Sequence, residues 1–206
     1  MNKIGGLSVI AVSLIIGATG STAEEEAKYA VALRDGRFEI RDYEPQIVAE
    51  VVVGGTLEEV GNRAFGRLFR YISGRNRSTA KIPMTAPVSQ EPRSEKIEMT
   101  APVGQQRADG GWAVSFVMPA SYTMESLPAP DDPGIRLRQV PAARVAAIRY
   151  SGLWSEKGYL RNKEALQSWI KEKGFAIAGE PVWARYNPPW TLWFMRRNEI
   201  LIPVRE

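Results

Sequence analysis

One order of sequence patterns occurs twice along the chain, and it constrains the fold more than any other feature. An alternating apolar stretch, a proline turn, a second alternating stretch and a glycine precede a helical pattern, first over 38–55 and again over 136–152. Alternation with a period of two is typical of strands with one buried face. Each helical pattern is followed by further strand-like segments, which end near 119 and 203. The sequence therefore predicts two duplicated strand-strand-helix-strand-strand units, over about 37–126 and 135–204.

Both helices have recognisable boundaries. Thr56, followed three residues later by Glu59, is the signature of a capping box and predicts the start of the first helix. Gly74 predicts its end. The apolar residues at helical spacing predict its buried stripe: Leu57, Val60, Ala64, Leu68, Tyr71 and Ile72. The second helix is expected over about 155–173, closed by Gly174. Its expected buried residues are Tyr159, Leu166, Trp169 and Ile170.

One helix covering the strands of each unit favours a single α+β domain over 24–206. Within the first unit the octapeptide 81–88 returns over 96–103 with one substitution. Its apolar residues alternate and point one way in a strand. Met84 and Met99 lie in these repeats and are soft potential ligands, although core packing is the favoured interpretation.

The composition excludes several kinds of site. The chain has no Cys and no His. Disulfides, zinc–thiolate sites, Ser-His-Asp triads and His-ligated metals are therefore impossible. Carboxylate, Tyr, Lys or Arg chemistry remains, as does binding without a reaction. We expect a protein that is not an enzyme, with no catalytic residues and no dedicated metal site.

The positive charge is concentrated in one segment. The net charge is only +4, but no acidic residue lies between Glu59 and Glu91. The basic residues in this interval are Arg63, Arg67, Arg70, Arg75, Arg77 and Lys81. A solvated basic face and a seat for an anionic ligand, acidic lipid or nucleic acid are both open interpretations.

The first residues have the pattern of an export signal. Lys3 precedes an apolar run over 4–16, small residues lead to Ala23, and an acidic run begins at Glu24. This pattern predicts a signal peptide over 1–23, cleaved after Ala23, and a periplasmic or secreted protein. A retained anchor is the alternative, but the run is shorter than the ~20 apolar residues of a membrane span. Export makes nucleic acid an unexpected partner.

The mature chain resembles the SOUL haem-binding protein family over nearly its whole length. The segments that carry the resemblance are 64–76, the two Met-Thr-Ala-Pro-Val repeats, 150–152, 186–189 and 196–200. The resemblance implies a distorted β-barrel built from the two duplicated units, with the helices on the outside. It also implies that the ligand is haem or another tetrapyrrole. The oligomeric state is left open.

Family members that bind haem without histidine are similar in using an apolar cleft along the first helix. The positions that match this cleft are Asn62, Phe65, Phe69 and Arg70, with Arg63 or Arg67 as further partners for the propionates. Phe65 and Phe69 are four residues apart and lie outside the buried stripe, so both are expected on an exposed face. The family pattern has a basic residue at Asn62 and Met at the two Phe positions.

Two other functions remain open. One is a small-molecule hydrolase of the related duplicated-barrel fold, with Glu50 as the candidate acid, although the solvent face is its more usual place. The other is contact with an acidic membrane through the basic segment. The segment 196–199 is expected to form a turn with Arg and Glu paired across strands. The segment 186–190 is expected either to line a pocket or to fill the barrel.

Overall fold

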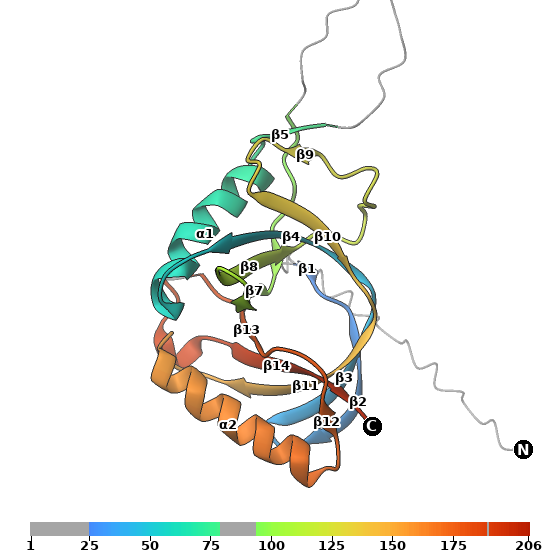
Figure 1. The fold of residues 1–206 in the computed structure, drawn as a ribbon, viewed down its shortest axis with the longest axis vertical. Coiled ribbons are helices and arrows are strands. Elements are labelled where there is room, and N and C mark those ends of the chain that lie inside the picture. The colour runs from blue at the N-terminus through green and yellow to red at the C-terminus, as the bar shows by residue number, and fades with distance from the viewer. Residues whose placement is uncertain (1–24, 79–93, 189) are drawn as a thin grey trace, which may run out of the picture.

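Strands make up most of the fold, and ten of them join into one large sheet with two helices against it (Figure 1). The computed structural model describes residues 25–78, 94–188 and 190–206. The predicted signal peptide and the first of the two octapeptide repeats, with Met84, lie outside the described residues. No helix in the described part is long and apolar enough to cross a membrane.

The large sheet contains β2 (Tyr29–Asp35), β3 (Phe38–Tyr43), β4 (Gln46–Val53), β7 (Val103–Ala108), β8 (Gly111–Val117), β10 (Ile135–Val140), β11 (Ala143–Tyr150), β12 (Ala176–Ile177), β13 (Val182–Arg185) and β14 (Asn198–Arg205). The short strands outside it are β1 (Glu25–Glu26), β5 (Asn76–Arg77), β6 (Thr100–Ala101) and β9 (Ala129–Pro130). The helices are α1 (Leu57–Ile72), α2 (Glu156–Glu172) and the short 3-10 helix η1 (Trp193–Met195).

The large sheet is antiparallel and runs in the order β10-β4-β8-β7-β13-β14-β11-β3-β2, with β12 beside β14. Its two ends, β10 and β2, do not pair with each other in the described residues. The expected distorted β-barrel is therefore wrong in this respect: the sheet is curved but not closed. Alternating patterns specify which face of a strand is buried, and that pattern is the same in a curved open sheet and in a barrel.

The α+β class is correct, and so are the two predicted helices. Thr56 and Glu59 form the capping box of α1, and all six residues of the predicted stripe are buried. The residues predicted to be buried in α2 are also buried, and Ser155 caps its N-terminus. In the large sheet, β2, β3 and β4 precede α1 and β7 and β8 follow it, whereas β10 and β11 precede α2 and β12, β13 and β14 follow it. The predicted order of two strands, a helix and two strands is therefore only approximate, and the two strands directly before each helix do not pair with each other. The duplication itself stays a prediction.

The core consists of two clusters, one beneath each helix. Beneath α1, Ala64 and Leu68 pack with residues of β4 and β8 such as Val51 and Phe116. Beneath α2, Leu166 and Ile170 pack with residues of β11 and β14. Because each helix buries only one stripe, residues beside that stripe can contribute to a site.

Candidate ligand-binding cavity

A cavity of about 500 Å³ lies along one side of α1, next to its buried stripe. Most of its lining side chains are apolar or aromatic. The lining residues are Gly61, Asn62, Phe65, Phe69, Met99, Thr100, Ala101, Val103, Trp154, Arg185, Tyr186, Asn187, Pro188 and Trp190. They come from α1, from the segment around β6 and β7, from the residue before the α2 cap and from the loop after β13. A concave, mostly apolar cavity with a few polar groups is the usual form of a small-molecule site.

Three of the predicted site residues meet in this cavity: Asn62, Phe65 and Phe69. The rings of Phe65 and Phe69 stack, with centroids 5.9 Å apart and planes 11° apart. Phe69 is 47% exposed, whereas Phe65 is half-buried and also meets the edge of Phe116 at 5.3 Å. Phe69 is therefore available to a ligand, and Phe65 belongs both to the cavity and to the core beneath α1.

The predicted arginine partners are placed differently. Neither Arg63 nor Arg70 is among the residues that line the cavity. Arg63 donates to the carbonyl oxygen of Gly54 at the start of α1. Arg67 is held by Asp132 through Nε at 2.7 Å and Nη2 at 2.5 Å. The hydrogen bonds from Arg67 hold the pKa of Asp132 below its ordinary value, and Arg70 adds to this effect by its charge.

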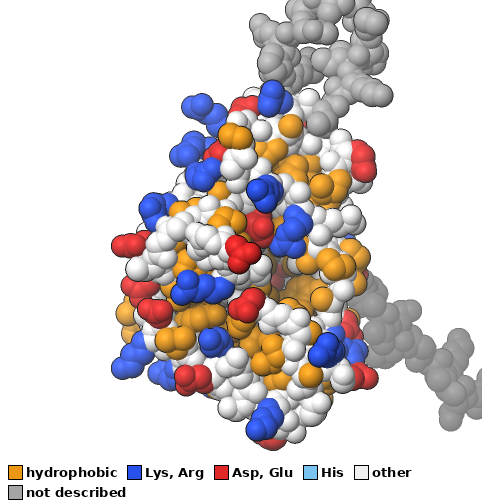
Figure 2. Space-filling view, viewed as in Figure 1, with side chains coloured by type: hydrophobic (Ala, Val, Ile, Leu, Met, Phe, Trp, Pro, Cys, Tyr) orange, Lys and Arg blue, Asp and Glu red, His pale blue; other side chains and the backbone are white. Residues whose placement is uncertain are grey.

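Arg70 is exposed and lies one residue after Phe69. Figure 2 shows Lys and Arg side chains gathered along the edge of the molecule where α1 lies. Arg67 forms an ion pair with Asp132, and Arg77 forms one with Asp131. Because these two acids neutralise part of the positive charge of the basic segment, the segment is less cationic in the fold than its sequence suggests.

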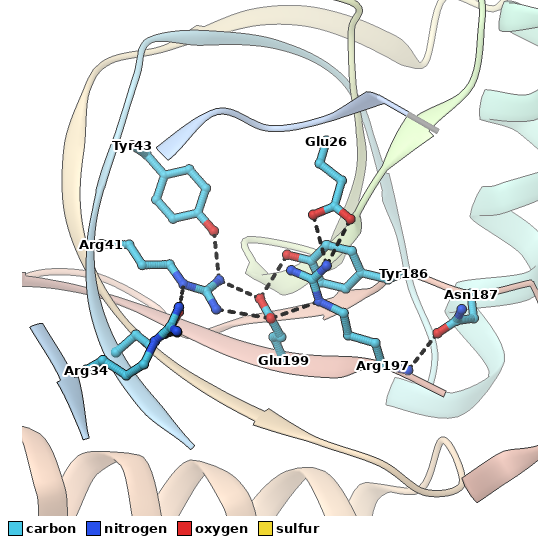
Figure 3. A network of polar contacts seen from close by, with 9 residues as sticks. Glu26, Arg34, Arg41, Tyr43, Tyr186, Asn187, Arg197 and Glu199 are labelled. Atoms are coloured by element: carbon cyan, nitrogen blue, oxygen red, sulfur yellow. Dashed lines mark hydrogen bonds and ion pairs between the residues drawn. The ribbon is translucent and has the colours of Figure 1, made fainter. Parts of the chain in front are cut away.

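The loop after β13 forms the wall opposite α1. Of the two alternatives for segment 186–190, lining a pocket is correct for Tyr186, Asn187, Pro188 and Trp190. A buried network fixes this wall (Figure 3). Tyr186 donates its hydroxyl to Oε2 of Glu199 at 2.8 Å, and Asn187 Oδ1 accepts from the backbone N–H of Arg197 at 2.6 Å.

Glu199 is the centre of that network. It is fully buried at the start of β14 and accepts from Arg41 at 2.6 and 3.1 Å and from Arg197 at 3.0 Å. Burial alone would raise the pKa of Glu199, but the hydrogen bonds and charges of the two arginines hold it below its ordinary value. Burial also raises the pKa of Tyr186. Tyr186 therefore stays a neutral donor, and Glu199 is a structural anion rather than a free base.

The segment 196–199 does not form the expected turn. Asn198 and Glu199 are buried residues of β14, and Asn198 binds Trp154 and the backbone oxygen of Gly152. Glu199 pairs with Arg41 of β3, although β11 separates β14 from β3 in the sheet. The expected pairing of Arg and Glu across strands is therefore present, but the arginine is Arg41, 158 positions away in the sequence.

Residues with other predicted roles are also placed. Met99 is half-buried, packs against the core beneath α1 and lines the cavity, so it is the methionine that a ligand in the cavity can reach. Glu50 lines neither of the two cavities described here and binds Arg138 at 2.8 Å. In the described part of the chain, no group of three or more acidic side chains is arranged to hold a metal ion.

A second cavity, of about 470 Å³, lies between the N-terminal strand and the loop after β8. Charged residues such as Glu25, Lys28 and Glu44 line it together with Ile47 and Met118. Its lining is more polar and contains none of the predicted site residues. The cavity beside α1 is therefore the better candidate for an apolar ligand.

Solved structures with the same fold include a hydrolase from Listeria innocua and the C-terminal domain of EcmrR. The first matches with a TM-score of 0.57 at 13% identity, over 84% of this chain and 94% of the hydrolase. The second matches with a TM-score of 0.54 at 13% identity, over 82% of this chain and 97% of that domain. At this identity the likeness concerns the fold alone.

Sequence comparison identifies the family, which similarity of fold alone does not. Heme-binding protein 1 of Xenopus tropicalis is 25% identical over 169 residues, which are 81% of this chain and 84% of that protein. The family model for the SOUL heme-binding protein matches residues 24–203, which include both long helices, nearly all of the large sheet and every lining residue of the cavity. The chain therefore belongs to the SOUL heme-binding protein family.

Proposed function

We propose that this protein binds haem or a related tetrapyrrole in the cavity beside α1 and acts as a carrier, buffer or sensor rather than as an enzyme. The observation that carries the proposal is the stacked pair Phe65 and Phe69, which forms one wall of a largely apolar cavity. A flat macrocycle suits such a wall because aromatic rings gain most from offset or edge contacts with other rings. Family membership supports the ligand class.

The residues of the cavity fit a tetrapyrrole in other respects. The exposed face of Phe69 and the half-buried Met99 offer apolar contact, and Arg70 lies beside Phe69 at the surface. In this proposal Arg70 meets a propionate at the rim, in a charge-assisted hydrogen bond. When bound, haem supplies an iron that the protein can meet only through Met, Tyr or water, since the chain has no His or Cys.

Absorbance titration tests this function. Haem and metal-free protoporphyrin should both bind, because ring contact rather than iron ligation holds the macrocycle. The absorbance spectrum of the haem complex should be that of high-spin or mixed-spin iron. It should not change with pH in the way that a histidine ligand would cause. A low-spin six-coordinate spectrum that Met99→Leu leaves unchanged would contradict this account of the iron.

Hydrolysis is not favoured by any residue of the cavity. The candidate acid Glu50 binds Arg138, and Glu199 is held by two arginines. The hydrolase of similar fold shares only the architecture. We therefore propose binding without a reaction.

Export belongs to the same proposal. Removal of residues 1–23 would deliver the domain to the periplasm or the exterior, where it would meet free tetrapyrrole. N-terminal sequencing of the protein from its native cell should begin at Glu24, and a cytoplasmic product that begins at Met1 would contradict export.

The duplicated origin of the two units is also a proposal, supported by the occurrence of strands before and after each of the two long helices.

One observation favours a second candidate function, peripheral contact with a membrane. The segment 190–195 exposes five apolar side chains: Trp190, Leu192, Trp193, Phe194 and Met195, each more than half exposed. Trp and Phe in amphipathic surroundings are common where proteins meet the headgroup region of a bilayer. Trp193→Ser with Phe194→Ser should abolish sedimentation with phosphatidylglycerol vesicles if this contact exists. If the double variant sediments like the wild type, the basic residues of α1 make the membrane contact instead. If the wild type does not sediment with the vesicles, the membrane-binding function is wrong.

A further inference from the structure

One cation in the cavity beside α1 has no acidic partner. Arg185, the last residue of β13, is half-buried and lines the cavity. The ion pairs among residues 25–78, 94–188 and 190–206 all involve other cations. Charged side chains are rarely buried without a partner, because the charge loses its hydration. Arg41, which is buried, is by contrast paired with Glu199.

The guanidinium of Arg185 is held in a fixed position. It donates from Nη2 to Oε1 of Gln105 at 2.8 Å, and its carbon lies 5.1 Å from the ring centre of Trp154 and 5.2 Å from that of Trp183. Gln105 is itself buried and donates to the backbone oxygen of Leu57 at 2.7 Å. These contacts orient the group and neutralise none of its charge. Burial lowers the pKa of Arg185 to about 10, so the group is still a cation at neutral pH.

Gly61 makes room for this cation on the inner edge of the cavity. A Cβ at Gly61 would lie 2.7 Å from both terminal nitrogens of Arg185. Glycine inside a helix costs about 1 kcal/mol relative to alanine. The close approach of the guanidinium is a physical reason for a glycine at this position of α1.

We propose that Arg185 binds a carboxylate of the ligand, so that the cavity selects flat apolar molecules that carry an acid group. This inference rests on the proposed function and adds a specificity-determining residue to it. An Arg–carboxylate pair in a cavity is strong and directional, since the guanidinium offers a planar fork of donors. Arg70 at the exposed rim is screened by salt, whereas Arg185 is shielded by Trp154 and Trp183.

The test compares protoporphyrin IX with its dimethyl ester, which has the same ring and no free carboxylate. The wild type should prefer the acid to the ester by roughly tenfold or more, since hydrogen bonds to charged groups contribute about 1.5–3 kcal/mol. Arg185→Gln should lose this preference while binding the ester as the wild type does. Arg185→Lys, which keeps the charge, should restore part of it. Salt should change the preference little.

Two further variants separate this role from other effects. Arg149→Gln removes an exposed arginine that lines neither cavity and should keep the wild-type preference. Gly61→Ala displaces the guanidinium without removing its charge and should reduce the preference even if Arg185→Gln folds poorly. Melting curves report folding for each variant.

The outcomes are distinguishable. If the wild type binds neither porphyrin, the proposed function fails and this inference fails with it. If the wild type binds both but Arg185→Gln and Gly61→Ala keep its preference for the acid, the role of Arg185 is overturned and the proposed function stands. If the preference is lost only at high salt in the wild type, an exposed arginine such as Arg70 holds the carboxylate.

Discussion

At the scale of single residues, Phe65 and Phe69 show what spacing can and cannot reveal. Their separation of four residues places them on one face of α1, and the structure stacks them there. The contact between Phe65 and Phe116 was not visible in the sequence, because the two residues are far apart in the chain. The expectation that both rings are outside the core is therefore correct for Phe69 and only half correct for Phe65.

This difference leads to a prediction. Phe69→Ala should leave the melting temperature nearly unchanged, since the ring is 47% exposed, and should weaken porphyrin binding. Phe65→Ala should also weaken binding but should destabilise the fold by about 1–3 kcal/mol, since it removes a ring that packs on Phe116. Porphyrin titration and thermal melts of both variants check this. Equal melting temperatures would mean that Phe65 is not part of the core.

The arginines of α1 lead to a second prediction at this scale. Arg70→Ala should weaken porphyrin binding at low salt and lose this effect at high salt, because the group is exposed. Arg67→Ala should instead lower stability by about 0.5–1 kcal/mol through its partly exposed ion pair with Asp132 and leave binding unchanged. Titrations at two salt concentrations, with denaturant unfolding of each variant, are the measurement. If Arg67→Ala weakens porphyrin binding as much as Arg70→Ala does, the assignment of Arg70 to the ligand and of Arg67 to stability is wrong.

At the scale of elements, the parts specified by nearby residues were predictable. The capping box, the buried stripe and the terminal glycine place α1 within a residue of its observed bounds. The strands on either side of Pro45 and Pro141 were also identified, but their pairing was not, because β3 pairs with β11 and β4 pairs with β10. The short strand β13 and the edge strand β2 were not identified, since β13 is only four residues long and β2 is exposed along most of its length. Arg185 and Trp154 were missed because only the fold brings these two residues beside α1.

The buried network at the start of β14 gives a pH-dependent prediction. The pKa of Glu199 is lower in the folded protein than its ordinary value of 4.5. A lowered folded-state pKa contributes stability that is complete above the unfolded-state value and is lost as the pH falls through the folded-state value. The melting temperature should therefore fall as the pH is lowered below about 4.5.

Glu199→Gln separates this carboxylate from the others. The variant should lose about 3–5 kcal/mol at neutral pH, since Arg41 and Arg197 keep buried charges without their anion. Its stability should depend less on pH between 5 and 3 than that of the wild type. Parallel pH profiles for the two proteins would show that other carboxylates cause the acid unfolding.

At the scale of the whole molecule, one curved sheet connects the two halves of the chain, and α1 and the loop after β13 line the same cavity. The cavity beside α1 exists only because the fold brings residues 61–69, 185–188 and 190 together. The network of Arg41, Tyr186, Arg197 and Glu199 fixes the far wall (Figure 3). The protein thus forms a largely apolar cavity between α1 and the loop after β13, which is the usual character of a small-molecule site.

Amide chemical shifts of the isotope-labelled protein, followed during titration with metal-free protoporphyrin IX, would locate the ligand. The shift changes should concentrate on residues 61–70, 99–103, 185–188 and 190, which contain the lining of the cavity beside α1 apart from Trp154. Residues of α2 and of the second cavity, such as 117–125, should be unaffected. Shifts centred on the second cavity, or saturable binding with no shift along α1, would contradict the account.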